Sequence, residues 1–333
     1  MRLTNKLMKG RVAAGLCAAV LALFPAVAAA DAAATYPERS VTILVPFAPG
    51  GAADLLARHM SKMLSGALGQ SFVVENRAGA GGTIGARQAA RAQPDGYTLI
   101  MGTNASHAIS AATYTKLPYD PLKDFAPISL VAFVPQALMV HPSLPINNVG
   151  ELIDYARKNP GSLNFGSAGN GTPGHLGMEL LKIMAGIDMA HVPFKGGNPA
   201  LIALAGAQVQ VAADNMNSAL PQIQAGAVRP IAVTSITRSR ALPDMRTIDE
   251  QGVTGFDSGS WFAMYAPAGT PEPIVAKLNR EITQALKDPE ISKMLAAQGA
   301  EPRPGPSSEL ADLMKADIAK WKGVADRIGY RVD

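Results

Sequence analysis

Cysteine, surplus charge of one sign and long apolar segments are all missing from the main body of this chain. The one cysteine, Cys17, lies within the first thirty residues, so a chain cleaved after Ala30 contains none. Such a chain forms no disulfide, no thiolate metal site and no cysteine nucleophile. A protein of this length without disulfides must rely on a large hydrophobic core, and two domains are expected.

The charge balance argues against a nucleic-acid-binding protein. The full chain has 30 Lys and Arg against 26 Asp and Glu, and a sequence pI of about 9.1. Four of the basic residues and none of the acidic ones precede Asp31, so cleavage leaves 26 of each sign. Nucleic-acid surfaces retain a basic patch, and none is visible here.

Residues 1–30 have the features of a cleavable export signal. A basic start is followed by the apolar segment Val12–Phe24 and by three alanines that end at Ala30. The apolar segment is too short to span a bilayer, and Leu16 before Cys17 argues against a lipid anchor. The sequence therefore predicts export to the periplasm with cleavage near Ala30–Asp31.

Short apolar segments of strand length alternate with helical patterns along the rest of the chain, which predicts an α/β fold with mostly parallel sheets. The expected strands are Val41–Phe47, Phe72–Glu75, Tyr97–Met101, Asn164–Gly166, His191–Phe194, Val209–Ala213 and Pro230–Thr234. Helices are expected near Asp54–Leu68, up to Ala92, around Leu176–Met184, after Gly197 and Asn217, and from Thr270–Pro271 and Ser308 onward. No linker is visible, so the expected domain crossovers are Ser129–Leu138 and Asp257–Met264.

Loops rich in Gly, Ser and Thr follow several of these strands, at the sheet edge where such folds bind ligands. The first, Ala48–Ala53, leads from a buried strand into a helix that begins near Asp54, and free amides there favour a carboxylate or phosphate. The candidate ligand-binding residues are Phe47, Ala48, Gly51, Ala52, Ala53, Asp54, Thr103, Asn104, Ser106, Ser167, Gly171, Thr172, His175, Lys195, Gly196, Gly197, Asp214 and Asn215.

Patterns for a nucleotide or metal cofactor fail. In Gly79–Gly85 the sixth position is Ile84 instead of the glycine that a dinucleotide fingerprint requires. The histidines show no zinc-binding spacing, and His175 with Glu179 suits a helical side-chain pair as well as a metal. No cofactor and no metal are expected.

Three polar positions leave alternatives open. Ser167 follows Gly166 outside a nucleophile-elbow pattern, so it is interpreted as a ligand donor, with a plain turn or a hydrolase using Ser167 and His175 as alternatives. Lys195 fits either an anion partner or a solvated lysine. Asp214 fits either a pocket residue or a helix cap.

Several motifs occur in an order that resembles the Bug family, the periplasmic solute receptors of tripartite tricarboxylate transporters (the TctC type). They are Val41–Asp54, Asn76–Gly85, Pro94–Leu99, Asn164–His175, His191–Gly196, Ala232–Ser235, Leu242–Asp244 and Ala266–Pro271. The resemblance covers essentially the whole chain after residue 30. It implies two α/β lobes of the type II periplasmic-binding-protein kind, with a ligand cleft that closes by hinge motion.

The resemblance also implies roles for the loops. Phe47–Asp54 would hold a ligand carboxylate through backbone amides and water, while Ser167–Thr172 and Lys195–Gly197 would bind the other end. The family commonly has tyrosine where this chain has Phe194, which favours a less polar ligand. The expected lobes are residues 31–132 with 260–333, and residues 133–259.

The sequence thus predicts an exported receptor, not an enzyme, that binds a small carboxylate such as a dicarboxylate, an acidic amino acid or an aromatic acid. Its expected partners are the ligand and, transiently, the membrane permease subunits of a tripartite tricarboxylate transporter; a monomer is expected. A receptor that feeds a sensor kinase is the alternative with the same binding chemistry.

Overall fold

The computed structural model describes residues 35–333, so the predicted export signal lies outside the described residues. The strands are β1 (Val41–Val45), β2 (Phe72–Asn76), β3 (Thr98–Thr103), β4 (Phe125–Val140), β5 (Asn164–Ser167), β6 (Ala190–Pro193), β7 (Val211–Asn215), β8 (Arg229–Val233), β9 (Gly259–Pro267) and β10 (Glu301–Pro302). The α-helices are α2 (Ala52–Leu68), α3 (Thr83–Ala90), α4 (Ser110–Thr113), α5 (Val149–Lys158), α6 (Pro173–Ala185), α7 (Gly197–Ala205), α8 (Met216–Gln224), α9 (Glu272–Leu286), α10 (Pro289–Ala297) and α11 (Ser307–Ile328). Three further short helices are η1 (Ala80–Gly82), η2 (Ala105–Ile109) and η3 (Asp249–Gln251).

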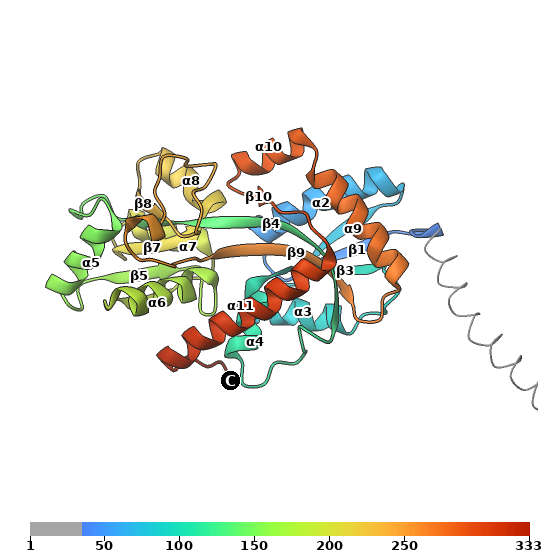
Figure 1. Cartoon of the computed structure of the whole chain (residues 1–333), viewed down its shortest axis with the longest axis horizontal. Coiled ribbons are helices and arrows are strands. Elements are labelled where there is room, and N and C mark those ends of the chain that lie inside the picture. The colour runs from blue at the N-terminus through green and yellow to red at the C-terminus, as the bar shows by residue number, and fades with distance from the viewer. Residues whose placement is uncertain (1–34) are drawn as a thin grey trace, which may run out of the picture.

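Parallel pairs form the two outer parts of one continuous, curled sheet. β1 pairs in parallel with β2 and β3, and β5 pairs in parallel with β6 and β7. We call these parts, with their helices, the β1 side and the β5 side; they lie at the right and left of Figure 1. The predicted α/β fold is confirmed, with helices flanking the sheet.

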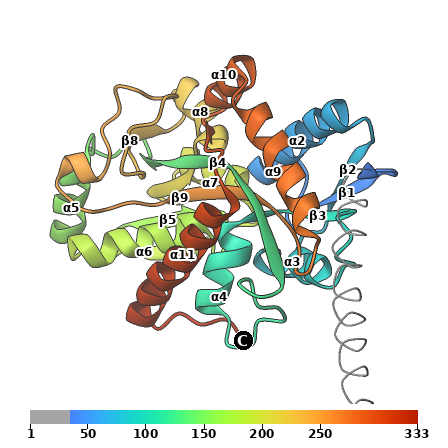
Figure 2. The ribbon, with the colours of Figure 1, turned by 45° about the vertical axis from the view of Figure 1, so that its right-hand side comes forward.

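Two long central strands, β4 and β9, connect the sides. They pair antiparallel with one another, β9 also pairs with β3, and β4 also pairs with β7 and β8. All nine residues of β9 are buried, which explains why its sequence shows no alternation. The two expected crossovers therefore lie largely within extended strands, which run between the two sides in Figures 1 and 2.

Local chemistry explains where the helices that matter here begin and end. The hydroxyl of Thr172 caps α6 by accepting from the backbone N of His175, with Pro173 in the first turn. Helix α2 begins at Ala52, two residues before the predicted start, and ends at Gly69 in the left-handed conformation. The helix expected from Thr270–Pro271 begins at Glu272 after Pro271, and the Thr270 hydroxyl donates to the carbonyl of Pro267 instead of capping the helix.

Helix α11 ties the two sides together. It contacts η2 and α4 on the β1 side and α6 on the β5 side, as its red ribbon shows in Figures 1 and 2. Its buried residues include Leu310, Met314, Trp321 and Val324, whose spacing places them along one apolar face of the helix. The chain after Gly329 then returns toward Tyr114, with which Val332 forms a bridge.

Candidate functional site

The first loop is held together by the carboxylate of Asp54. Its Oδ2 accepts hydrogen bonds from the backbone N of Gly50 and from Arg58, both at 3.0 Å, and its Oδ1 accepts from Asn76 at 3.0 Å. The same amide of Asn76 donates to the carbonyl of Phe47 at 3.1 Å. Burial alone raises the pKa of Asp54, but the hydrogen bonds, that of Arg58 foremost, outweigh it and lower the pKa. The ionised carboxylate of Asp54 therefore stabilises the Phe47–Gly51 turn through these hydrogen bonds.

The second group of candidates, at the end of β3, is turned inward. The Ser106 hydroxyl bonds to Thr103 and, at 2.9 Å, to the Nδ1 atom of His107. Asn104 donates to the carbonyl of Gly259 in β9 at 2.7 Å, and its Oδ1 is buried without a partner. These side chains connect the β1 side to a central strand.

The Ser167–Thr172 loop is stabilised by hydrogen bonds within the β5 side. The Ser167 hydroxyl accepts from the backbone N of Gly169, donates to its carbonyl, and lies 2.7 Å from the Nε2 atom of His191. A hydroxyl has one donor and two acceptor positions, so these contacts occupy all three. Thr172 also donates to the Gly169 carbonyl at 2.7 Å. The structure thus pairs Ser167 with His191, not with His175 as the hydrolase alternative required.

Two imidazole rings stack beside this loop. The centroids of His175 and His191 are 3.9 Å apart at an interplanar angle of 14°, and Phe165 stacks on His191. Burial, followed by the charges of His191 and Lys182, lowers the pKa of His175 to about 3. Burial and Lys182 lower the pKa of His191 to about 4. Both rings are therefore neutral at neutral pH.

Glu179 does not pair with His175, one of the two interpretations left open for that spacing. Its carboxylate instead lies 3.0 Å from the ammonium of Lys182. Among residues 35–333, no group of three or more His, Cys, Asp or Glu side chains is placed to hold a metal ion.

The Lys195–Gly197 loop packs directly against Asp214. A Cβ added to Gly197 would lie only 1.8 Å from the Asp214 Oδ2 atom, so this glycine lets the loop approach the carboxylate. The backbone N of Gly196 donates to the carbonyl of Ala168, which joins this loop to the Ser167–Thr172 loop. Burial raises the pKa of Asp214 to about 6. Its Oδ2 has no partner, while Oδ1 accepts from the backbone N of Asn215.

A cavity of about 420 Å³ lies where the two sides face one another, and we call it the cleft cavity. Asn170 and Gly171 line it from the β5 side. Its other lining residues are Ala80, Gly81, Ala105, Ile109, Ser110, Thr113 and Tyr114 of the β1 side, with Tyr330, Arg331, Val332 and Asp333 of the C-terminal segment. Of the two charged lining residues, Arg331 is paired with Asp326, and the Asp333 carboxylate accepts from the hydroxyl of Thr115; the other lining residues are uncharged.

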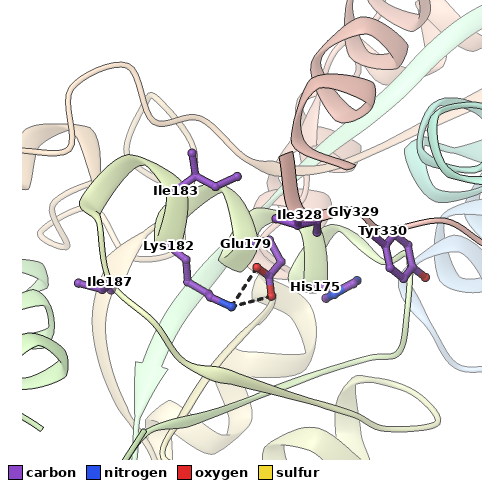
Figure 3. Close-up of a pocket in the computed structure, with 8 residues that line it drawn as sticks. All are labelled: His175, Glu179, Lys182, Ile183, Ile187, Ile328, Gly329 and Tyr330. Atoms are coloured by element: carbon purple, nitrogen blue, oxygen red, sulfur yellow. Dashed lines mark hydrogen bonds and ion pairs between the residues drawn. The ribbon is translucent and has the colours of Figure 1, made fainter. Parts of the chain in front are cut away.

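A larger opening of about 540 Å³, which we call the α6–α11 cavity, shares Tyr330 with the cleft cavity as a lining residue. Figure 3 shows Glu179 and Lys182 paired among its lining residues, with His175 and Tyr330 near one another at one end. Its remaining lining residues are Gly329 and the apolar Ile183, Ile187 and Ile328. None of the predicted loops except the helix start at His175 reaches it.

Most predicted site residues therefore lie in hydrogen-bonded loops, one set on the β1 side and one on the β5 side, but few of them line the cleft cavity. Of the candidates, Gly171 lines it directly. Phe47 and Ser106 do not line it; both side chains lie 3.0 Å from the position of a Cβ on Gly82, the residue after the lining Gly81. Lys195 is exposed, as are Ala48 and Gly51, whereas Ala52 is half-buried and Ala53 is buried.

Several residues that shape the site were missed by the sequence reasoning. Asn76 ends a strand and opens a Gly-rich segment, so its place at the sheet edge could have identified it. His191 was identifiable only through knowledge that β5 and β6 are neighbours. For Tyr330, three residues from the end of the chain, no local pattern indicated a role.

An α/β sheet in two parts, with Gly-rich loops facing a cavity between them, is typical of solute-binding proteins. Comparisons with known proteins agree. The profile described as "Tripartite tricarboxylate transporter family receptor" (TctC) matches residues 56–330. BugT of Bordetella pertussis is 36% identical over 318 residues, 94% of this chain and 98% of BugT.

Solved structures of similar proteins have the same fold. Rpa4515 of R. palustris, determined with adipate, is 41% identical with a TM-score of 0.83, covering 88% of this chain and 98% of Rpa4515. MatC (Rpa3494) of Rhodopseudomonas palustris, with bound malate, is 38% identical with a TM-score of 0.78, covering 87% of this chain and 99% of MatC. The chain belongs to the tripartite tricarboxylate transporter receptor family, and it is a solute receptor rather than an enzyme.

Proposed function

We propose that this chain is an exported receptor that binds a small dicarboxylate in the cleft cavity and delivers it to the membrane subunits of a tripartite tricarboxylate transporter. The observation that carries the proposal is the cleft cavity itself, which has loops of the β1 side on one wall and Asn170 and Gly171 on the other. Similar receptors have been solved with adipate and malate, both of them dicarboxylates. Among residues 35–333, no helix has the length and apolar character needed to cross a membrane.

Apart from the ion-paired Arg331 and the carboxylate of Asp333, the wall of the cleft cavity offers neutral donors to an anion. Backbone amides and hydroxyls stabilise a carboxylate and cost less free energy when the cavity is empty than an unpaired buried guanidinium does. Phe194 packs its ring near Gly166 beside the Ser167–Thr172 loop, where it adds apolar surface. We therefore expect a preference for a dicarboxylate with an aliphatic spacer over a hydroxylated one.

We also propose that the two sides are lobes that close on the ligand. The expected lobe boundaries, at residues 132/133 and 259/260, fall at nearly opposite positions of the paired strands, because Phe133 pairs with Trp261 and Val134 with Ser260. Bending at this one place of β4 and β9 would move one side relative to the other. Ligand would shift that equilibrium only as far as it binds the closed form more tightly.

A thermal-shift panel tests the binding function. We expect adipate at one hundred times its dissociation constant to stabilise the folded chain by about 2.7 kcal/mol, which raises the melting temperature by several degrees. Malate should give a smaller shift, and adipamide, which has the same length without charge, should give none. No shift with any mono- or dicarboxylate, including aromatic acids and acidic amino acids, would contradict the proposal.

A further inference from the structure

Resting on the proposed function, we infer that His175 and His191 are positioning residues, a stacked pair that holds both ends of the Ser167–Thr172 loop in its ligand-binding shape. Neither ring needs to contact the ligand for this role. The inference follows from the hydrogen bonds of the two rings, from their stacking, and from the position of the loop against the cleft cavity.

His191 holds the beginning of the loop. Its Nε2 atom lies 2.7 Å from the Ser167 hydroxyl, which is the shortest of that hydroxyl's three contacts. The two residues are brought together by the parallel pairing of β5 and β6, in which Ser167 lies beside Pro193. The backbone N of Phe194 also donates to the Ser167 carbonyl at 3.0 Å. The start of the loop is thus tied to the neighbouring strand by both a side chain and the main chain.

His175 holds the end of the loop. The backbone N of Gly171 donates to its Nδ1 atom at 3.2 Å, so the neutral ring must carry its proton on Nε2. Gly171 has a φ of 68°, a conformation that a glycine adopts without strain. The ring is itself placed by the start of α6, where the backbone N of His175 donates to Thr172. One imidazole therefore fixes the last turn before the helix.

The stack makes the two holding points depend on each other. The ring centroids of His175 and His191 are 3.9 Å apart, that of Phe165 lies 4.8 Å from His191, and that of Tyr330 lies 5.0 Å from His175 in an edge contact. Rotation of either ring would break a hydrogen bond to the loop and a ring contact. Tyr330 belongs to the C-terminal segment after α11, so the stack also connects the Ser167–Thr172 loop to that segment.

The held segment is the part of the β5 side that lines the cleft cavity. Asn170 and Gly171 line that cavity, and Gly171 is itself the residue whose backbone N is held by His175. Loss of either hydrogen bond would let these backbone amides take several orientations, and a ligand would then have to order them on binding. The pair should therefore act on affinity more than on the stability of the whole fold.

Calorimetric titration of the wild-type chain and of variants with adipate tests this role, at a temperature where all of them are folded. We expect His191→Leu to weaken adipate binding by about fivefold to thirtyfold, since the hydrogen bond to Ser167 is lost while bulk is kept. His191→Gln, whose amide can reach the same hydroxyl, should stay within about threefold of the wild-type chain. His141→Leu is the matched control, because His141 lies 2.7 Å from the hydroxyl of Ser143 in a segment outside both cavities, and its loss should leave affinity unchanged.

Nitrogen-15 NMR of the imidazoles gives a readout that needs no ligand. We expect the Nε2–H tautomer for His175, neutral rings for both residues at pH 7, and a change at His191 but not at His141 in Ser167→Ala. An Nδ1–H or doubly protonated His175 would overturn the inference, as would unchanged affinity in both His191→Leu and Ser167→Ala. If His191→Leu does not fold, Ser167→Ala alone decides. A wild-type chain that binds no acid overturns the proposed function instead, while the NMR result still tests the geometry of the pair.

Discussion

Replacing Asp54 with alanine should weaken adipate binding by about tenfold to a hundredfold while the chain still folds. The substitution removes the acceptor for three hydrogen bonds, from Gly50, Arg58 and Asn76, and it frees the Asn76 amide that also holds the Phe47 carbonyl. Hydrogen bonds to a charged group contribute about 1.5–3 kcal/mol each when their partner is buried. Part of that loss should appear as disorder of the first loop, which isothermal titration calorimetry with adipate would report as lower affinity.

Asp95→Ala is a matched control for this variant. Asp95 also accepts from an arginine, Arg39, and from a backbone N, that of Tyr97, but it makes no hydrogen bond to the Phe47–Gly51 turn. Its removal should leave the affinity for adipate unchanged. If Asp54→Ala folds and binds adipate as tightly as the wild-type chain, the first loop has no part in the site.

Gly197→Ala should lower both stability and affinity, because the new methyl group would lie 1.8 Å from the Asp214 Oδ2 atom. Asp214 is buried within β7, where it pairs with Ala137 of β4, so it has little room to withdraw. Overpacking of this kind costs about 1–3 kcal/mol of stability, and displacement of the Lys195–Gly197 loop should lower adipate affinity by about tenfold. Thermal unfolding together with titration separates the two effects.

Gly66→Ala provides the comparison on an open helix surface. Gly66 lies in α2, and no atom lies within 4 Å of the position that a Cβ would take. Alanine there should be neutral or raise stability by up to about 1 kcal/mol.

A double variant tests the clash itself: Asp214→Ala in the Gly197→Ala background should restore stability, because it removes the clashing carboxylate. Equal stability of Gly197→Ala and wild type would refute the close packing.

Much of the fold could be predicted because periodicity and turn chemistry act locally. Gly69, Thr172 and Pro173 favour helix ends by their own conformational preferences. In the structure Gly69 ends α2, and Thr172 and Pro173 begin α6. The central strands could not be predicted as strands. β4 contains two prolines, shifts register against β9, and exchanges partners along its length, so its form depends on tertiary pairing.

The loops of the site were predictable, but the contacts within them were not. Glycine and serine after a buried strand indicate a loop at the sheet edge, which located Ser167 and Gly197. The partners of these residues, His191 and Asp214, lie 24 and 17 positions further along the chain. Such pairs depend on which strands become neighbours, and a single sequence does not contain that information.

Hydrogen exchange with and without adipate tests most directly whether the ligand binds between the two sides. We predict added protection in peptides covering residues 47–54 and 103–110 of the β1 side and residues 167–172 of the β5 side, in the same sample. The residues of the α6–α11 cavity between 179 and 187 should change little. Protection confined to one side, or centred on that second cavity, would contradict the account.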